Sequence, residues 1–161
     1  MPVRGRKEIP PNFLSRATFL LPAGIVLFFD QLTKKGIEAS LEVGQSIPLW
    51  SPFFYLTHVK NQGIAFGFFQ NGENLLLGLI TFSIGTLVVM GLRLHPPRAK
   101  TQIALGFILG GAVGNWVDRI RIGAVVDFLD FRVWPVFNLA DTAISVGVGL
   151  FLLDFFKKHA T

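Results

Sequence analysis

The sequence predicts a mostly α-helical, polytopic membrane protein: a four-transmembrane-helix bundle with a small outer-face β platform and an interfacial loop. Three observations support this fold class. Hydrophobic residues make up 51% of the 161 residues, and the mean hydropathy is +0.53. Only 16% of the residues are charged, compared with about 25% in an average globular domain. Four stretches are long and apolar enough to cross a bilayer, which takes about 20 residues.

The predicted spans and the segments between them form a single membrane domain over residues 1–161. The spans cover about residues 17–37, 75–94, 101–119 and 137–156, after a tail of residues 1–16 and with outer loops at about 38–74 and 120–136. The first span lacks a small-residue cleavage site and ends in FFDQLTKK, so it does not resemble a cleavable signal peptide. The third span becomes polar after Trp116 and is therefore expected to be short.

The basic residues predict the orientation of the chain in the membrane. Nine lie on the side of the two termini: Arg4, Arg6, Lys7, Arg16, Arg93, Arg98, Lys100, Lys157 and Lys158. The other side holds six, so the positive-inside rule places both termini in the cytoplasm. The aromatic residues Trp50, Tyr55, Trp116 and Trp134 fall on the outer side, where such rings favour the membrane interface. This topology accounts for the net charge of +5 and the pI near 10 without a nucleic-acid partner.

Several kinds of chemistry are excluded or disfavoured by the composition. The chain has no Cys, which excludes a disulfide scaffold, thiol catalysis and a Cys-ligated metal. His58, His95 and His159 are scattered and no HExxH motif occurs, so a zinc protease is not expected. A Ser–Lys dyad with Lys34 or Lys35 lacks a matching serine, and GxSxG is absent. We expect no metal and no organic cofactor.

The two outer loops carry patterns of their own. Val, Ile, Tyr, Phe and Thr are frequent around residues 47–59, where Pro48 and Pro52 interrupt the run, and this predicts short strands. The loop at 120–136 contains IGAVVDFLDFRVWPVF and is predicted to be a second, interfacial segment. Both loops lie on the same side, so we expect the chemistry there.

Polar residues gather at the outer ends of the spans, where each needs a partner or a task. They are Asp30, Asn61, Asn115, Asp118, Arg119, Asp127, Asn138 and Asp141. A structural polar cluster that closes the helix ends is the simpler interpretation for Asp118, while Arg119 suits an ion pair or substrate anchoring equally well. Glycines on the third span, at 106, 110, 111 and 114, predict close helix packing.

Asp127 and Asp141 are the carboxylates with the most apolar neighbours. Asp127 lies between VV and FL, and Asp141 precedes TAISVGVGLFLL. Desolvation raises a carboxyl pKa, and two such groups can share one proton and act as base and acid. From spacing alone, a structural role is the commoner one for such a pair. Asp130 competes as a candidate, but beside Arg132 it is predicted to be a simple exposed charge.

Five motifs together resemble the lipoprotein signal peptidase family (signal peptidase II), the bacterial aspartyl peptidases that mature prolipoproteins. They are DQLTK at 30–34, NQGIAFG at 61–67, GGAVGNWVDR at 110–119, VVDF at 125–128 and FNLADTAI at 137–144. They occur in the order of the family and cover roughly residues 20–156. Each motif is weak alone, but the set is highly specific.

The resemblance implies a role for each site residue. Asp127 and Asp141 match the catalytic pair of the family. The positions that line the family's site and position its substrate are occupied here by Asn61, Asn115, Arg119 and Asn138. Supporting positions are Asp30, Asp118 and Gly111. The implied substrate is a prolipoprotein with a diacylglyceryl-Cys, cleaved on the amino side of that Cys.

The resemblance also implies where the protein acts and with which partners. It implies a monomer in the bacterial cytoplasmic (inner) membrane, in contact with membrane lipids, with its site near the outer leaflet. The chain itself, having no Cys, cannot be an acylated substrate. The alternatives are a non-enzymatic small membrane transporter or a scaffold subunit.

Overall fold

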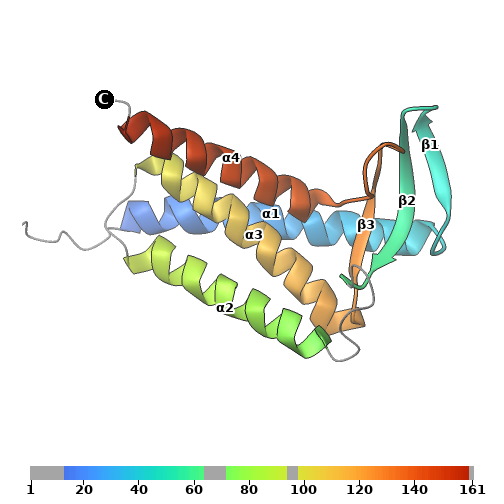
Figure 1. Cartoon of the computed structure of the whole chain (residues 1–161), viewed down its shortest axis with the longest axis horizontal. Helices are drawn as coiled ribbons and strands as arrows, with labels where there is room; N and C mark the ends of the chain where they lie inside the picture. Colours follow the sequence, from blue (N-terminus) through green and yellow to red (C-terminus); the bar gives the residue numbers. More distant parts are fainter. Residues whose placement is uncertain (1–12, 64–71, 94–97, 160–161) are drawn as a thin grey trace, which may run out of the picture.

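Four helices run alongside one another, and a small sheet stands at one end of them (Figure 1). The computed structural model describes residues 13–63, 72–93 and 98–159. Its elements are α1 (Phe13–Ser40), β1 (Ser46–Trp50), β2 (Phe54–Asn61), α2 (Gly72–Arg93), α3 (Ala99–Ile122), β3 (Val125–Asp130) and α4 (Leu139–His159). Within the described ranges, four helices are long and apolar enough to cross a membrane. The predicted fold class is therefore confirmed.

Helix α3 packs against the other three helices, and its glycines explain how closely they approach. A Cβ added to Gly110 would lie 2.5 Å from the carbonyl oxygen of Ala23 in α1. One added to Gly111 would collide with the carbonyl oxygen of Ala140 in α4. The small residues thus form two packing faces, one for each neighbour, as the glycine spacing predicts.

Helix α3 is longer than the sequence suggested. The polar residues after Trp116 do not end it, because Asn115 and Asp118 are buried against other elements and keep their backbone helical. The helix ends where Gly123 adopts a left-handed conformation (φ 70°) and its N–H donates to the carbonyl of Arg119. The 24-residue helix therefore brings these polar side chains into the bundle.

The sheet has three antiparallel strands in the order β1–β2–β3. The strands predicted within 47–59 are present as β1 and β2. The segment expected to be a separate interfacial loop instead supplies β3 to the same sheet, pairing Val125 with Asn61 and Asp127 with Val59. This pairing covers the edge of β2, which would otherwise leave backbone groups unpaired, and it brings Asn61 beside Asp127.

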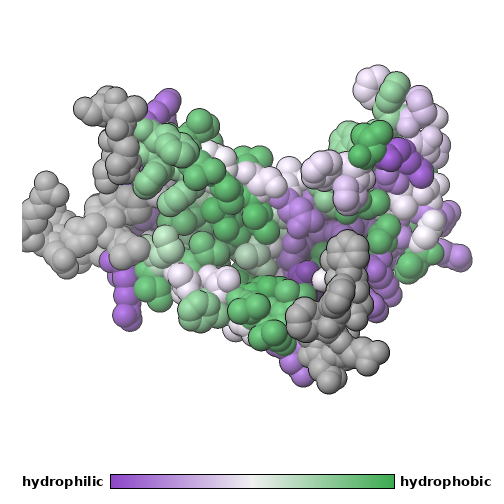
Figure 2. Space-filling view, viewed as in Figure 1, coloured by the Kyte–Doolittle hydropathy of each residue, from purple (hydrophilic) through white to green (hydrophobic). Residues whose placement is uncertain are grey.

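Apolar side chains form two buried clusters and a wide exposed surface. Phe19, Ala23, Leu105 and Leu109 fill the space between α1 and α3. A second cluster joins the end of α1 to β3, and its buried members are Ile37, Leu41, Val126 and Phe128. Figure 2 shows that hydrophobic residues cover the helices, whereas hydrophilic ones gather toward the sheet. This distribution suits helices surrounded by lipid.

We predict that Gly110→Ala lowers the free energy of unfolding by about 1–3 kcal/mol, because the added methyl forces α1 away from α3. Gly85→Ala is the matched control, since a Cβ at Gly85 in α2 would have no neighbour within 4 Å. Thermal unfolding of the purified variants in detergent measures the difference. Equal midpoints for the two variants would contradict the packing role of Gly110.

Candidate active site

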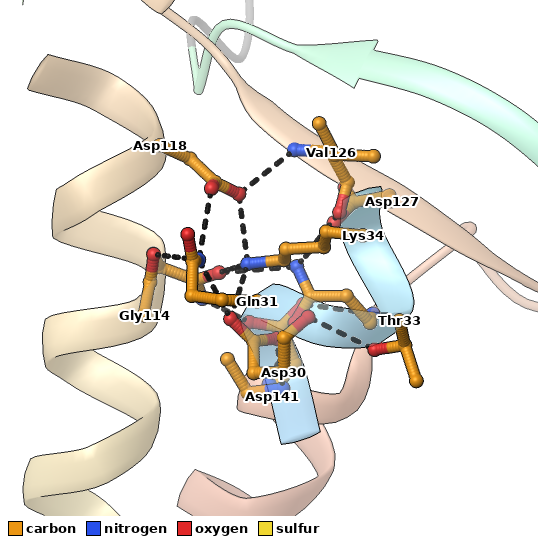
Figure 3. Close-up of polar contacts among 12 residues, drawn as sticks. Asp30, Gln31, Thr33, Lys34, Gly114, Asp118, Val126, Asp127 and Asp141 are labelled. Carbon is orange, nitrogen blue, oxygen red and sulfur yellow. Dashed lines mark hydrogen bonds and ion pairs between the residues drawn. The ribbon is translucent and has the colours of Figure 1, made fainter. Parts of the chain in front are cut away.

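The predicted site residues come together where α1, α3 and α4 meet β3, and Figure 3 shows four of them there: Asp30, Asp118, Asp127 and Asp141. Direct hydrogen bonds link five of them: Asn61, Asn115, Asp127, Asn138 and Asp141. Asp30 and Asp118 join this group through Lys34, which forms an ion pair with each of them and donates to Asn115. Arg119 joins them through a hydrogen bond from Nη1 to the carbonyl of Asn115, at 3.2 Å. Of the family-like motif at 61–67, only residues 61–63 lie within the described part of the chain.

Asp141 occupies the first turn of α4. The side-chain Oδ1 of Asn138 accepts a hydrogen bond from the backbone N–H of Asp141 at 2.9 Å. In return, Oδ2 of Asp141 accepts one from the backbone N–H of Asn138 at 3.3 Å. This reciprocal pair is a capping box, which fixes both side chains at the helix start. The positive end of the helix dipole there favours Asp141 as a carboxylate.

Asp127 lies on β3 and is only 2% exposed. Its Oδ1 accepts a hydrogen bond of 2.6 Å from Nδ2 of Asn138, and its Oδ2 accepts one of 2.9 Å from Nδ2 of Asn61. One residue therefore holds the two carboxyl groups together, because Asn138 donates to Asp127 from its side-chain amide and to Asp141 from its backbone N–H. The non-local pairing of β2 with β3 supplies the second amide.

The surroundings of Asp127 favour its protonated form. Burial is the largest effect, and it raises the pKa of Asp127 from 3.8 to about 6. The hydrogen bond from Asn61 lowers this pKa, the negative charge of Asp141 raises it, and Asn138 and Lys34 lower it again. The site therefore holds two carboxyl groups in contrasting environments, one desolvated and one at a helix N-terminus.

A buried ion cluster lies beside the pair. The ammonium of Lys34 is 2.9 Å from Oδ2 of Asp30 and 2.8 Å from Oδ2 of Asp118, and all three side chains are 0% exposed. Lys34 also donates a 2.9 Å hydrogen bond to Oδ1 of Asn115. We call Asp30, Lys34 and Asp118 the ion brace. In the sequence, Lys34 is a candidate only for a Ser–Lys dyad that lacks a serine, although its i,i+4 spacing from Asp30 also favours an ion pair.

The ion brace holds four elements together. Oδ1 of Asp30 accepts the backbone N–H of Ala140 in α4, at 3.0 Å. Oδ2 of Asp118 accepts the backbone N–H of Val126 in β3, at 3.2 Å. Gln31 donates to Asp118 and to the carbonyl of Gly114, as Figure 3 shows. The supporting roles expected for Asp30 and Asp118 thus have a geometric basis.

Asn115 connects the ion brace to the carboxyl pair. Its Oδ1 accepts from Lys34, and its Nδ2 donates to Oδ1 of Asp141 at 2.8 Å. The same Oδ1 accepts a 3.1 Å hydrogen bond from Nδ2 of Asn138. A continuous chain of hydrogen bonds therefore runs from a buried ammonium to both carboxyl groups.

Arg119 is the cation that faces open space beside the pair. Its charge interacts with Asp127 and Asp141, and it lines a cavity of about 150 Å³ together with Gln62 and Asn74. Its Nε is buried and has no hydrogen-bond partner in the described ranges. A guanidinium with an unused donor is suited to a carbonyl or carboxylate oxygen of a bound peptide.

Asp130 corrects one expectation. It was predicted to be an exposed charge, but its side chain is only 5% exposed. Its Oδ2 accepts a hydrogen bond from Thr57 at 2.7 Å, and its Oδ1 accepts one from the backbone N–H of Arg132 at 2.8 Å. The β2–β3 pairing, which the sequence reasoning did not foresee, turns Asp130 inward. It braces the sheet and has no hydrogen bond or ion pair to Asp127 or Asp141 within the described ranges.

Comparisons with known proteins agree on one family. The family model described as signal peptidase (SPase) II matches residues 23–157. The lipoprotein signal peptidase of Brevibacillus brevis is 43% identical over 140 residues, which is 86% of this chain and 94% of the relative. That of Moorella thermoacetica is 46% identical over 131 residues, or 81% and 87% of the two chains. A solved bacterial membrane enzyme superposes with a TM-score of 0.84 at 29% identity, covering 92% of this chain and 97% of its own.

We predict that Asp127 makes the protein less stable as the pH rises. Its folded-state pKa is raised from 3.8 to about 6, so its contribution is fully present below pH 3.8 and is lost as the pH rises through about 6. The loss amounts to roughly 3 kcal/mol. Asp127→Asn removes this dependence, so the gap between the unfolding midpoints of parent and variant should change between pH 4 and pH 8. A constant gap would contradict the buried, protonated carboxyl.

Proposed function

The chain belongs to the signal peptidase II family, and from that premise we propose that Asp127 and Asp141 are the catalytic pair with which it cleaves its substrate. The chain is a protease that removes signal peptides from prolipoproteins, as its relatives' name and family indicate. The observation that carries the assignment of the pair is the contact of Asn138 with both carboxyl groups, one buried and one at the start of α4.

The two environments assign different tasks to the two carboxyl groups. Asp141 is the base, because the helix N-terminus and the donors on Asn115 and Asn138 stabilise its carboxylate. Asp127 is the acid, because burial raises its pKa to about 6 and so lets it hold a proton at higher pH than an ordinary aspartate. This division is the acid–base logic of a carboxyl dyad.

The reaction then proceeds with one water molecule. Asp141 takes a proton from the water, whose oxygen forms a bond to the scissile carbonyl carbon, while Asp127 donates its proton to the carbonyl oxygen. When the tetrahedral intermediate collapses, the C–N bond breaks and Asp141 gives its proton to the leaving amine. Asp127 recovers its proton from the hydroxyl of the intermediate. Both carboxyl groups return to their starting states.

We propose that the substrate is a prolipoprotein whose Cys carries diacylglycerol, cleaved on the amino side of that Cys. The site lies at one end of four apolar helices, so the lipid can remain in the bilayer while the peptide bond reaches the pair. Arg119 and the amides of Asn61 and Asn115 are available to hold the peptide backbone. We propose that the protein acts as a monomer and that its two carboxyl groups serve as acid and base without a cofactor.

The protein is a multi-pass bacterial membrane protein, and we propose an orientation with both termini in the cytoplasm and the site near the outer leaflet. The N-terminal end of α1 and the C-terminal end of α4 lie at the end of the bundle away from the sheet (Figure 1). Exposed apolar side chains on the sheet end include Trp50 at 70%, Trp134 at 69% and Val133 at 91%. Such residues favour contact with outer-leaflet lipid.

A transporter or scaffold subunit is not supported by the position of the polar groups. The site residues gather at one end of the bundle rather than along a path through it, and they bond mainly to one another. A pathway for a solute would need polar groups at the middle of the spans.

We predict that Asp127→Asn and Asp141→Asn each lower kcat at least about 10³-fold, because each removes one proton-transfer group of the pair. Asp154→Asn is the matched control: it makes the same substitution in the same helix as Asp141, and Asp154 bonds to Thr101 and Arg98 far from the pair. Cleavage of a diacylglyceryl-modified prolipoprotein by purified protein measures the effect. Retained cleavage by either of the first two variants would refute the assignment.

We predict that kcat/KM falls as the pH rises above about 6, because Asp127, whose pKa is raised to about 6, then loses the proton that it must donate. Rates at low substrate concentration, measured between pH 5 and pH 9 with one lipidated substrate, give the profile. A rate that stays constant across this range would exclude Asp127 as the acid.

A further inference from the structure

We propose that Lys34 is a positioning residue for the reaction, which acts through Asn115 to hold Asp141 as the carboxylate of the pair. This inference rests on the roles proposed above for Asp127 and Asp141. It gives the fully buried lysine a task beyond joining α1 to α3.

The contacts of Lys34 exceed what an ion pair requires. An ammonium has three donors, and Lys34 uses them on Asp30, Asp118 and Oδ1 of Asn115, at 2.9, 2.8 and 2.9 Å. The two carboxylates compensate for the burial of the charge, which otherwise costs several kcal/mol. The third donor therefore points away from the ion pairs and toward the catalytic pair.

This third contact sets the orientation of the Asn115 amide. An ammonium can only donate, so Asn115 must turn its oxygen toward Lys34 and its NH₂ group the opposite way. The NH₂ group then donates to Asp141 at 2.8 Å, a contact that favours the carboxylate form. Nδ2 of Asn138 donates to the same oxygen at 3.1 Å, so Lys34 is the charged one of the two donors that hold the amide in this orientation.

The orientation is passed on to Asp127. The oxygen of Asn115 also accepts from Nδ2 of Asn138, and that same Nδ2 donates to Oδ1 of Asp127 at 2.6 Å. The backbone N–H of Asp141 orients the Asn138 amide by donating to its oxygen at 2.9 Å, and Lys34 and Asn138 together orient the Asn115 amide. Lys34 acts on Asp127 and Asp141 through these side chains. Within the described residues it has no hydrogen bond or ion pair to either carboxyl group.

The charged groups facing this network come from every element packed around it: Asp30 and Lys34 on α1, Asp118, Arg119 and Arg121 on α3, Asp127 on β3 and Asp141 on α4. Strand β2 contributes only the neutral amide of Asn61. Arg119 also interacts with both members of the pair, but it is unchanged in the variants below and cancels from the comparison.

The test compares three variants. Lys34→Met removes the ammonium at similar length. Asp118→Asn weakens the same ion brace but leaves Lys34 on Asn115. Lys35→Met removes a neighbouring exposed charge and is the control. Protein labelled with ¹³C at the aspartate carboxyl carbons is titrated by NMR, with signals assigned from Asp127→Asn and Asp141→Asn, and the pH–rate profile is measured with the lipidated substrate.

We expect Lys34→Met to move the titration of the pair, and the pH–rate profile, to higher pH by about one unit, because a positive charge that favours carboxylates is lost. Asp118→Asn removes a negative charge and should move both to lower pH. Lys35→Met should leave both unchanged. Activity reduced equally at every pH in the Lys34 and Asp118 variants, with unchanged titrations, would show that Lys34 only joins helices and would overturn the proposal.

The outcomes separate this inference from the proposed function. The NMR titration needs no substrate, so it tests Lys34 even if the parent protein fails to cleave a prolipoprotein, a result that would refute the function instead. If Lys34→Met does not fold, Lys34→Gln takes its place, because it removes the charge but keeps a polar side chain in the cluster: an upward shift supports the proposal, and no shift or a downward shift overturns it.

Discussion

The ion brace is the interaction on which the arrangement of this protein depends. Charges in a membrane need partners, and Lys34 finds two in Asp30 and Asp118, with no exposed surface on any of them. Each acid also accepts a hydrogen bond from the backbone of another element: Asp30 from Ala140 of α4, and Asp118 from Val126 of β3. The elements that carry Asp127 and Asp141, β3 and α4, are therefore positioned relative to α1 and α3 by one cluster of charge.

The carboxyl pair gains its asymmetry from local structure. Asp141 lies at the start of a helix and within a capping box, both of which stabilise a negative charge. Asp127 lies on a strand, in a desolvated position that disfavours a negative charge. Burial of Asp127 lowers stability at neutral pH, and the same burial raises the pKa of the carboxyl that we propose as the acid. Under that proposal, stability and activity are opposed at this residue.

Features encoded locally could be predicted from the sequence, whereas those that depend on long-range pairing could not. Hydropathy identified the four helices, and the β-branched run identified β1 and β2. Polar residues at the ends of apolar spans identified the site, because burying them without a function is costly. The pairing of β3 with β2 joins residues far apart in the chain, so neither the burial of Asp130 nor the contact between Asn61 and Asp127 was visible. The place of Lys34 in the ion brace could not be predicted, because one of its two acidic partners, Asp118, lies on another helix.

The central claim is that Asp127 and Asp141 act together on one carbonyl group. The most direct measurement is a structure of the protein bound to a lipidated peptide in which a hydroxyl-bearing carbon replaces the scissile carbonyl, imitating the tetrahedral intermediate. We predict that this hydroxyl lies within hydrogen-bonding distance of both carboxyl groups, with Asn138 still bridging them. A bound peptide whose hydroxyl lies away from either carboxyl group would contradict it.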